Sequence, residues 1–123
     1  MFSIERHVVG SYRTNCYVLT SAGQAIVIDP GDEGDRLIRE LGEADVSHIV
    51  LTHCHSDHIG AVNELAERYG AIVCVGRDDA VGVADPHLSG FDEEGSDYRV
   101  ERVDRLLDDG DALAWGEDRL EVI

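Results

Sequence analysis

The chain has 123 residues, a length that fits one compact domain spanning 1–123. It carries 26 Asp and Glu residues against 10 basic residues, all of them Arg, which gives a formal net charge of −16. This acidity argues against nucleic acid as a partner, because neutralising phosphates needs clustered bases, and equally against anionic membranes. No apolar run approaches the ~20 residues that span a bilayer, and the N-terminus lacks the apolar segment of a signal peptide, so we expect a cytoplasmic protein.

The complete absence of Lys has two compatible explanations, a GC-rich genome that favours Arg codons and a halophilic cytoplasm in which screening permits dense surface carboxylates. Three cysteines, Cys16, Cys54 and Cys74, form no CxxC pair, and this predicts reduced thiols rather than a disulfide framework.

The first part of the chain predicts strands that alternate with helices. Short apolar runs predict strands over 2–9, 15–20, 25–28, 48–52 and 71–75. Two amphipathic segments predict helices, one with Asp32 as N-cap and Gly42 after its end, and one running from Asp57 to Gly70.

The last part of the chain predicts shorter elements. We expect a short helix over 77–85 and a solvated loop over 85–99. Three short strands should follow, 105–107, 112–115 and 119–123, joined by two hairpin turns at 108–111 and 116–118. Together these elements indicate an α/β fold with a mixed sheet.

A cluster of metal-ligand residue types follows the strand at 48–52. His53 and His55 are two apart in extended chain, so their side chains point the same way and can reach one metal ion. Asp57 and His58 follow where the chain turns into a helix, and they can serve a second ion beside the first. Imidazole and carboxylate ligands suit zinc, and also iron or manganese.

The segment THCHSDHIG, residues 52–60, resembles the H-x-H-x-D-H signature of the metallo-β-lactamase superfamily. Three flanking segments, TNCYVL, VIDPG and LLDDGDAL, resemble the glyoxalase II-like branch in the same order. The resemblance implies the N-terminal half of a four-layer αβ/βα sandwich with metal ions at one edge between two sheets. It also implies a hydrolase in which a metal-bound hydroxide attacks a thioester or a similar small ester-like substrate.

By position in the motif, the resemblance assigns His53 and His55 to a first zinc ion and Asp57 and His58 to a second. Asp57 would also act catalytically by orienting the attacking hydroxide, and the same side chain is a candidate helix N-cap. Asp29 either orients the metal-binding loop from behind the ligands or serves only as a turn residue before Pro30.

The sequence departs from the family pattern after residue 123, where a third histidine, a shared carboxylate and a last histidine would be expected. We therefore expect the domain to be truncated and this chain alone to be inactive, with two ligands for each metal. A mononuclear iron dioxygenase of sulfur compounds and a non-catalytic interaction module remain alternatives. In the last case the chain would form a homodimer through an exposed apolar sheet face.

Overall fold

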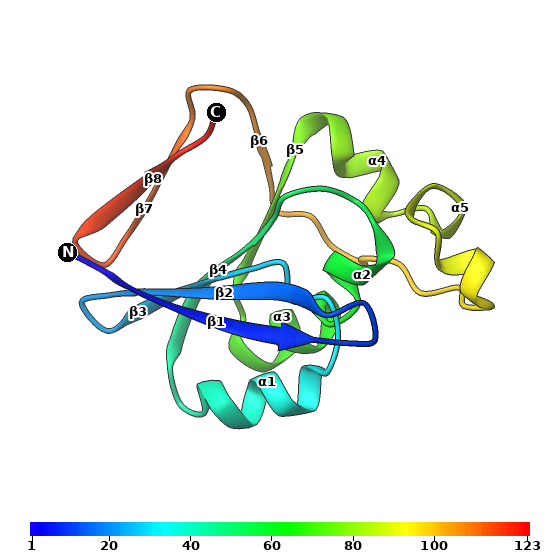
Figure 1. The fold of residues 1–123 in the computed structure, drawn as a ribbon. Helices are drawn as coiled ribbons and strands as arrows, with labels where there is room; N and C mark the ends of the chain where they lie inside the picture. Colours follow the sequence, from blue (N-terminus) through cyan, green and yellow to red (C-terminus); the bar gives the residue numbers. More distant parts are fainter.

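Six of the eight strands form one mixed sheet in the order β1-β2-β3-β4-β5-β6, in a computed structural model that describes residues 1–123 (Figure 1). The strands of this sheet are β1 Ser3–Val9, β2 Thr14–Ser21, β3 Gln24–Ile28, β4 Asp45–Leu51, β5 Ile72–Gly76 and β6 Arg105–Leu107. The pairs β1–β2 and β2–β3 are antiparallel, and the strands from β3 to β6 run parallel. The predicted α/β fold with a mixed sheet is confirmed.

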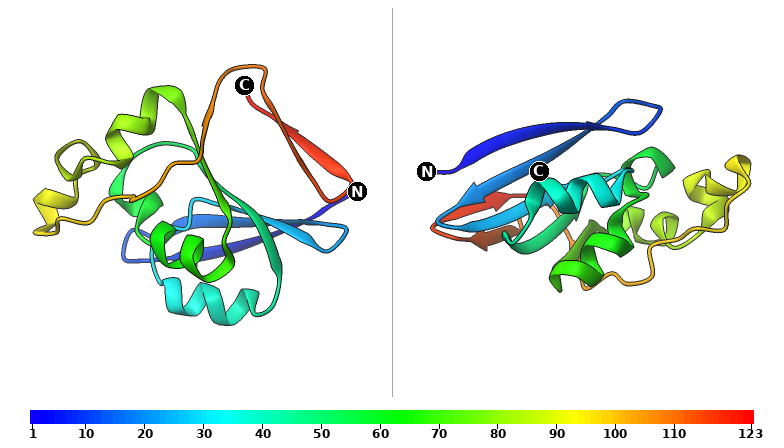
Figure 2. Two further views of the ribbon diagram at one scale, coloured as in Figure 1. Left: turned by 180° about the vertical axis from the view of Figure 1, so that it is seen from behind. Right: turned by 90° about the horizontal axis from the view of Figure 1, so that it is seen from below.

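Two helices, α1 Gly34–Leu41 and α3 Val62–Tyr69, pack on one face of this sheet (Figure 2). The other helical elements are short: α2 Ser56–Ile59, the 3-10 turn η1 Arg77–Asp79, α4 Ala80–Val83, α5 Pro86–Ser89 and the 3-10 turn η2 Phe91–Glu94. None of the helices is both long and apolar enough to cross a membrane.

The strand pleat divides the apolar side chains between the two faces of the sheet. In β3, Ala25 and Val27 face the helices and belong to a main core of 19 buried residues. Ile26 between them faces the opposite way and contacts Leu19 and Trp115. The indole Nε1 of Trp115 donates a hydrogen bond to the Leu19 carbonyl at 3.1 Å, which fastens the hairpin of β7 Ala112–Trp115 and β8 Asp118–Glu121 to the second face.

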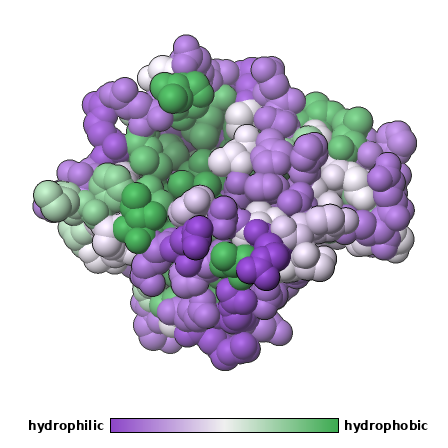
Figure 3. Space-filling model, viewed as in Figure 1, coloured by the Kyte–Doolittle hydropathy of each residue, from purple (hydrophilic) through white to green (hydrophobic).

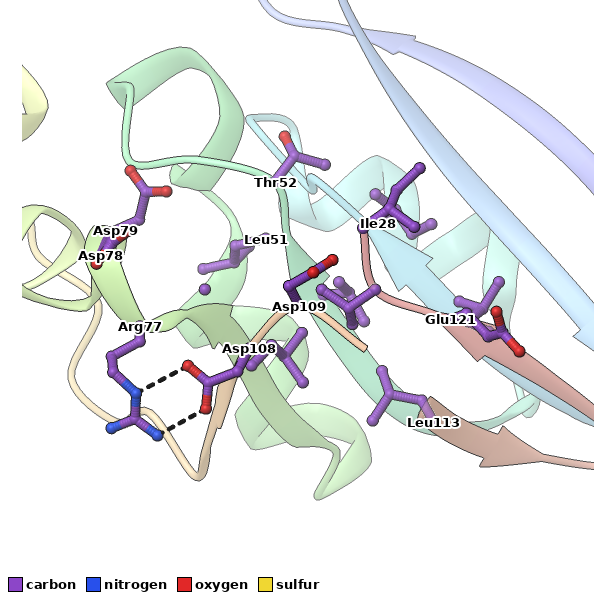
Figure 4. A pocket seen from close by; sticks show the side chains of 16 residues that line it. Ile28, Leu51, Thr52, Arg77, Asp78, Asp79, Asp108, Asp109, Leu113 and Glu121 are labelled. Carbon is purple, nitrogen blue, oxygen red and sulfur yellow. Dashed lines mark hydrogen bonds and ion pairs between the residues drawn. The ribbon is translucent and has the colours of Figure 1, made fainter. Parts of the chain in front are cut away.

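The hairpin covers only part of the second face and leaves a cavity of about 570 Å³ beside the ends of the parallel strands. Its floor is apolar and appears as the hydrophobic hollow in Figure 3. Figure 4 shows Ile28, Leu51 and Leu113 lining it, with a bidentate ion pair between Arg77 and Asp108 at one rim.

The single helix predicted from Asp57 to Gly70 is wrong, because the chain forms two helices, α2 and α3. The amide of Gly60 donates to the carbonyl of Gly31 at 3.0 Å, and the amide of Ala61 donates to that of Pro30 at 2.9 Å. These amides therefore bond to the loop after β3 instead of the preceding helical turn, and the helix is interrupted there.

The hairpin predicted between 105–107 and 112–115 is also wrong. The turn itself forms, since the Asp111 amide donates to the Asp108 carbonyl at 3.0 Å. However, Arg105–Leu107 pairs in parallel with β5, and the turn carries the chain out of the sheet into the β7–β8 hairpin. Arg105–Leu107 pairs with the edge of β5, which is distant in the sequence, and residues of the local turn do not predict such a pairing.

Two smaller predictions are corrected at helix ends. Glu33 in a left-handed conformation, rather than Asp32, precedes α1, and the Asp32 carboxylate accepts a hydrogen bond from the Glu33 amide. The loop expected over 85–99 contains α5 and η2, because Asp85 caps α5 and Pro86 fits its first position.

Candidate metal centre

The motif residues lie at the edge of the sheet where the parallel strands β3 and β4 end. Asp29 directly follows β3, and the loop that carries His53 and His55 directly follows β4 (Figure 1). Carboxyl ends of parallel strands meet at one edge, so residues more than twenty positions apart become neighbours there.

Asp29 fastens the start of this loop from beneath. Its side chain is buried, and its backbone adopts a left-handed conformation with φ 54°, which Asp tolerates better than most residues. One carboxylate oxygen, Oδ1, accepts from the Thr52 amide at 2.8 Å. The other, Oδ2, accepts from the Thr52 hydroxyl and lies 2.9 Å from Nδ1 of His58.

His53 and His58 lie side by side above Asp29. Their ring centroids are 4.0 Å apart, and one ligand atom from each, together with one from Asp29, falls within a mutual distance of 4.8 Å. Burial, and secondly the neighbouring His58, lower the pKa of His53 below its ordinary value. A lowered pKa favours the neutral imidazole, which is the form that binds metal.

Although Asp29 belongs to this three-residue cluster, its bonding favours an orienting role over ligation. Oδ2 already faces the Thr52 hydroxyl and the His58 ring, and Oδ1 is occupied by a backbone amide. Nδ1 of His58 is engaged by Asp29, so Nε2 is the ring nitrogen that remains available for other contacts.

Asp57 lies beside the free nitrogen of His58. Its Oδ2 is 3.4 Å from His58 Nε2 and accepts a hydrogen bond from the Thr14 hydroxyl at 2.9 Å. Two ligand atoms each about 2.1 Å from a tetrahedral ion lie about 3.4 Å apart, so this pair has the spacing of two ligands of one ion. The expected N-cap role of Asp57 is wrong, since α2 begins at Ser56 with His55 as its cap.

His55 is the most exposed of the three motif histidines. Its ring stands edge-on to that of His53, with centroids 4.8 Å apart. The structure therefore brings His53 next to both other histidines, rather than separating the motif into two isolated pairs.

Cys54 faces away toward α4, where its Sγ lies against Gly82. Burial, and secondly the nearby Asp79, raise the pKa of the Cys54 thiol.

Sequence reasoning missed two hydroxyl residues of this site, Thr14 and Thr52. Thr14 belongs to a different strand, β2, and bonds to Asp57 across 43 positions. Thr52 immediately precedes the motif, and its place at the end of a strand beside a histidine was the only local signal. Gly31 was likewise missed: a Cβ there would meet the Asp57 carbonyl oxygen.

Residues 9–123 match the family model of the metallo-beta-lactamase superfamily, so the chain belongs to that superfamily. It is 33% identical over 122 residues to the "Probable metallo-hydrolase YqgX" of Bacillus subtilis strain 168, covering 96% of this chain and 57% of that protein. It is 37% identical over 71 residues to the hydroxyacylglutathione hydrolase GloC of Haemophilus influenzae Rd, covering 55% of this chain and 34% of that one. The glyoxalase II-like relationship is confirmed.

The crystal structure of the B3 metallo-beta-lactamase BLEG-1 superposes with a TM-score of 0.88 at 28% identity, covering 97% of this chain and 59% of that one. A di-zinc class B3 enzyme, LRA-12 from an Alaskan soil metagenome, gives 0.71 at 30% identity, covering 87% and 44%. A di-iron-bound form of TTHA1623 gives 0.75 at 26% identity, covering 89% and 56%. The chain thus spans just over half the length of YqgX and of BLEG-1.

Proposed function

We propose that this chain supplies part of the binuclear metal centre of a hydrolase, with His53 and His55 serving one ion and Asp57 and His58 serving the other. The observation that carries the proposal is the pairing at His58: Nδ1 is held by Asp29, while Nε2 lies 3.4 Å from Asp57 Oδ2. A metal-ligating histidine characteristically directs its second nitrogen to a carboxylate in this way.

Zinc is the metal we propose for both positions. Imidazole nitrogens and one carboxylate form a donor set that zinc accepts, and LRA-12 is described as a di-zinc enzyme. The same donors suit iron, and TTHA1623 has been obtained in a di-iron-bound form. Metal analysis of the purified protein distinguishes the two.

The reaction we propose is hydrolysis of a thioester or a similar small ester-like substrate, in line with the hydroxyacylglutathione hydrolase relationship. When bound, the metal ions supply Lewis acidity and lower the pKa of water. Asp57 contributes as the catalytic carboxylate of this chain. Thr14 holds its Oδ2, while Oδ1 accepts no hydrogen bond from the protein and is available to orient the attacking water.

Residues near Asp57 form a place for part of a small substrate. A cavity of about 240 Å³ adjoins the carboxylate and lies between the β1–β2 turn and η2. Hydroxyl groups line it, among them those of Ser11 and Tyr12, together with the carboxylates of Asp32 and Glu94, and no basic residue does. We propose that this cavity receives a hydrogen-bonding part of the substrate that is neutral or positively charged.

We further propose that residues 1–123 alone do not catalyse hydrolysis. The four candidate ligands provide two for each ion, whereas catalytic zinc sites usually have three protein ligands and a water. The expected result is no thioester turnover by this chain with added zinc, measured as thiol release from a hydroxyacylglutathione. Turnover with a full complement of two zinc ions in a monomer would contradict the ligand count.

The metal assignment is tested by replacing both His53 and His55 with Ala and measuring bound metal by elemental analysis. We expect loss of at least one metal equivalent per chain. His87→Ala is the matched control, because His87 is largely exposed and pairs only with Asp92. Unchanged metal content in a folded double variant would show that these two residues are not ligands.

A further inference from the structure

A hydroxyl group connects His53 to the same carboxylate that holds His58. Thr52 Oγ1 lies 2.9 Å from Nδ1 of His53, and the same hydroxyl donates to Oδ2 of Asp29. His58 Nδ1 contacts that oxygen directly, at 2.9 Å. The buried Oδ2 of Asp29 is therefore linked to two histidine rings, directly to His58 and through the Thr52 hydroxyl to His53.

The positions of the protons follow from what each group can donate. An ionised carboxylate only accepts hydrogen bonds, so the Thr52 hydroxyl must use its single proton on Asp29. The Thr52 oxygen can then only accept from His53, which requires a proton on Nδ1 of that ring. The direct contact with Asp29 requires the same of His58. Both neutral rings consequently present an unprotonated Nε2 on the side away from Asp29.

We propose that Thr52 is a positioning residue that extends the influence of Asp29 to His53, so that one carboxylate sets the tautomer of both histidines for metal binding. The inference rests on the proposed metal centre for its functional meaning, but the tautomers themselves are properties of the metal-free protein. Thr52 is suited to the task because its amide also donates to Asp29 Oδ1, at 2.8 Å, which holds the residue at two points.

Two substitutions at Thr52 distinguish the effect of its hydroxyl group from the effect of the rest of the side chain. Thr52→Val keeps the shape and the β-branched stiffness but removes the only group that can accept from His53. Thr52→Ser keeps the hydroxyl and loses a methyl group. A purely structural role would make these two variants similar, whereas a relay makes only the valine variant defective.

The first measurement is the imidazole ¹⁵N spectrum of the metal-free full chain at a pH where the rings are neutral, with signals assigned from His53→Gln and His58→Gln variants. We expect a protonated Nδ1 and an unprotonated Nε2 for both rings. Thr52→Val should change the His53 pattern toward a tautomer mixture and leave His58 unaltered. Thr52→Ser should match the unmodified protein, and Asp29→Asn should change both rings.

The second measurement is zinc affinity, by competition with a chromogenic chelator. Removing a partner behind a metal-ligating histidine typically costs 10–100-fold in affinity, which is the loss expected for Thr52→Val. Thr52→Ser should stay within about threefold of the unmodified protein by the same reasoning. Thr20→Val is the control for a threonine-to-valine change outside the site, since Thr20 lies opposite Ser3 and Ala25, at the end of β2 away from Thr14.

The two measurements distinguish failure of the proposed relay from failure of the proposed metal centre. An unaltered His53 tautomer in Thr52→Val, or equal losses of affinity in the valine and serine variants, would overturn the relay. If the tautomers respond as expected but no variant binds zinc, the relay is upheld as the device that orients the two rings, and the proposed metal centre is wrong.

Discussion

Gly31→Ala should damage the candidate metal centre although it replaces none of the proposed ligands. Gly31 lies in the loop after β3, against the start of α2. An ideal Cβ at this position would lie 1.8 Å from the Asp57 carbonyl oxygen and 3.2 Å from the His58 Cα. Since real Cβ atoms essentially never come within 3.0 Å of such an atom, the two backbone segments must separate by about 1.2 Å.

The size of the effect follows from what joins these segments. Two backbone hydrogen bonds, Gly60 to Gly31 and Ala61 to Pro30, span the contact at 3.0 and 2.9 Å. Overpacking in a close contact costs about 1–3 kcal/mol, and each weakened hydrogen bond adds about 1 kcal/mol. We therefore expect a loss of about 3–5 kcal/mol in the free energy of unfolding. Metal sites require placement within about 0.5 Å, so zinc affinity should fall at least tenfold.

Urea denaturation measures the stability change, and chelator competition measures the affinity of the folded fraction. Gly76→Ala is the matched control, because its Cβ would meet nothing nearer than Asp79 Oδ2 at 3.9 Å and its backbone needs no left-handed conformation. That variant should be neutral or stabilised by about 0.4–1 kcal/mol. Gly31→Ala with native stability and native zinc affinity would refute the argument from close backbone approach.

Three further outcomes are expected. Thr14→Val should weaken zinc binding at least about tenfold, because it removes from Asp57 a charge-assisted hydrogen bond worth about 1.5–3 kcal/mol. An unchanged titration with zinc would count against this role of Thr14. The melting temperature should rise with salt concentration, because the carboxylates that give a net charge of −16 repel one another and salt screens this repulsion. The Debye length falls from about 30 Å at 0.01 M to about 3 Å at 1 M. Thermal unfolding in sodium chloride and in sodium sulfate measures the effect, and a melting temperature independent of salt would contradict it. Burial, and secondly Arg105, lower the pKa of His48 below 6.5, so the native state binds this proton less tightly than the unfolded state. Stability should then decline as the pH falls below about 6.5, and less steeply in His48→Gln, as measured by urea denaturation across pH.

Much of the architecture could be predicted from local patterns. Apolar runs predict every strand of the parallel series, although they do not predict the pairing of β6 with β5, and the helix over 34–41 is predicted within a few residues of its observed ends. The H-x-H-x-D-H segment identified the candidate ligands by residue type and spacing alone. These features are readable because side-chain period and turn chemistry act over a few residues.

Local sequence patterns thus predict the family, the mixed α/β fold and the set of residues that are chemically able to hold a metal. The folded structure adds that Asp29 contacts His58, that Thr14 donates to Asp57, and that Thr52 joins His53 to the Asp29 carboxylate. It also decided the break between α2 and α3 and the parallel pairing of β6. In most of these cases the partners are more than twenty residues apart, and no local pattern encodes the strand register and loop contacts that bring them together.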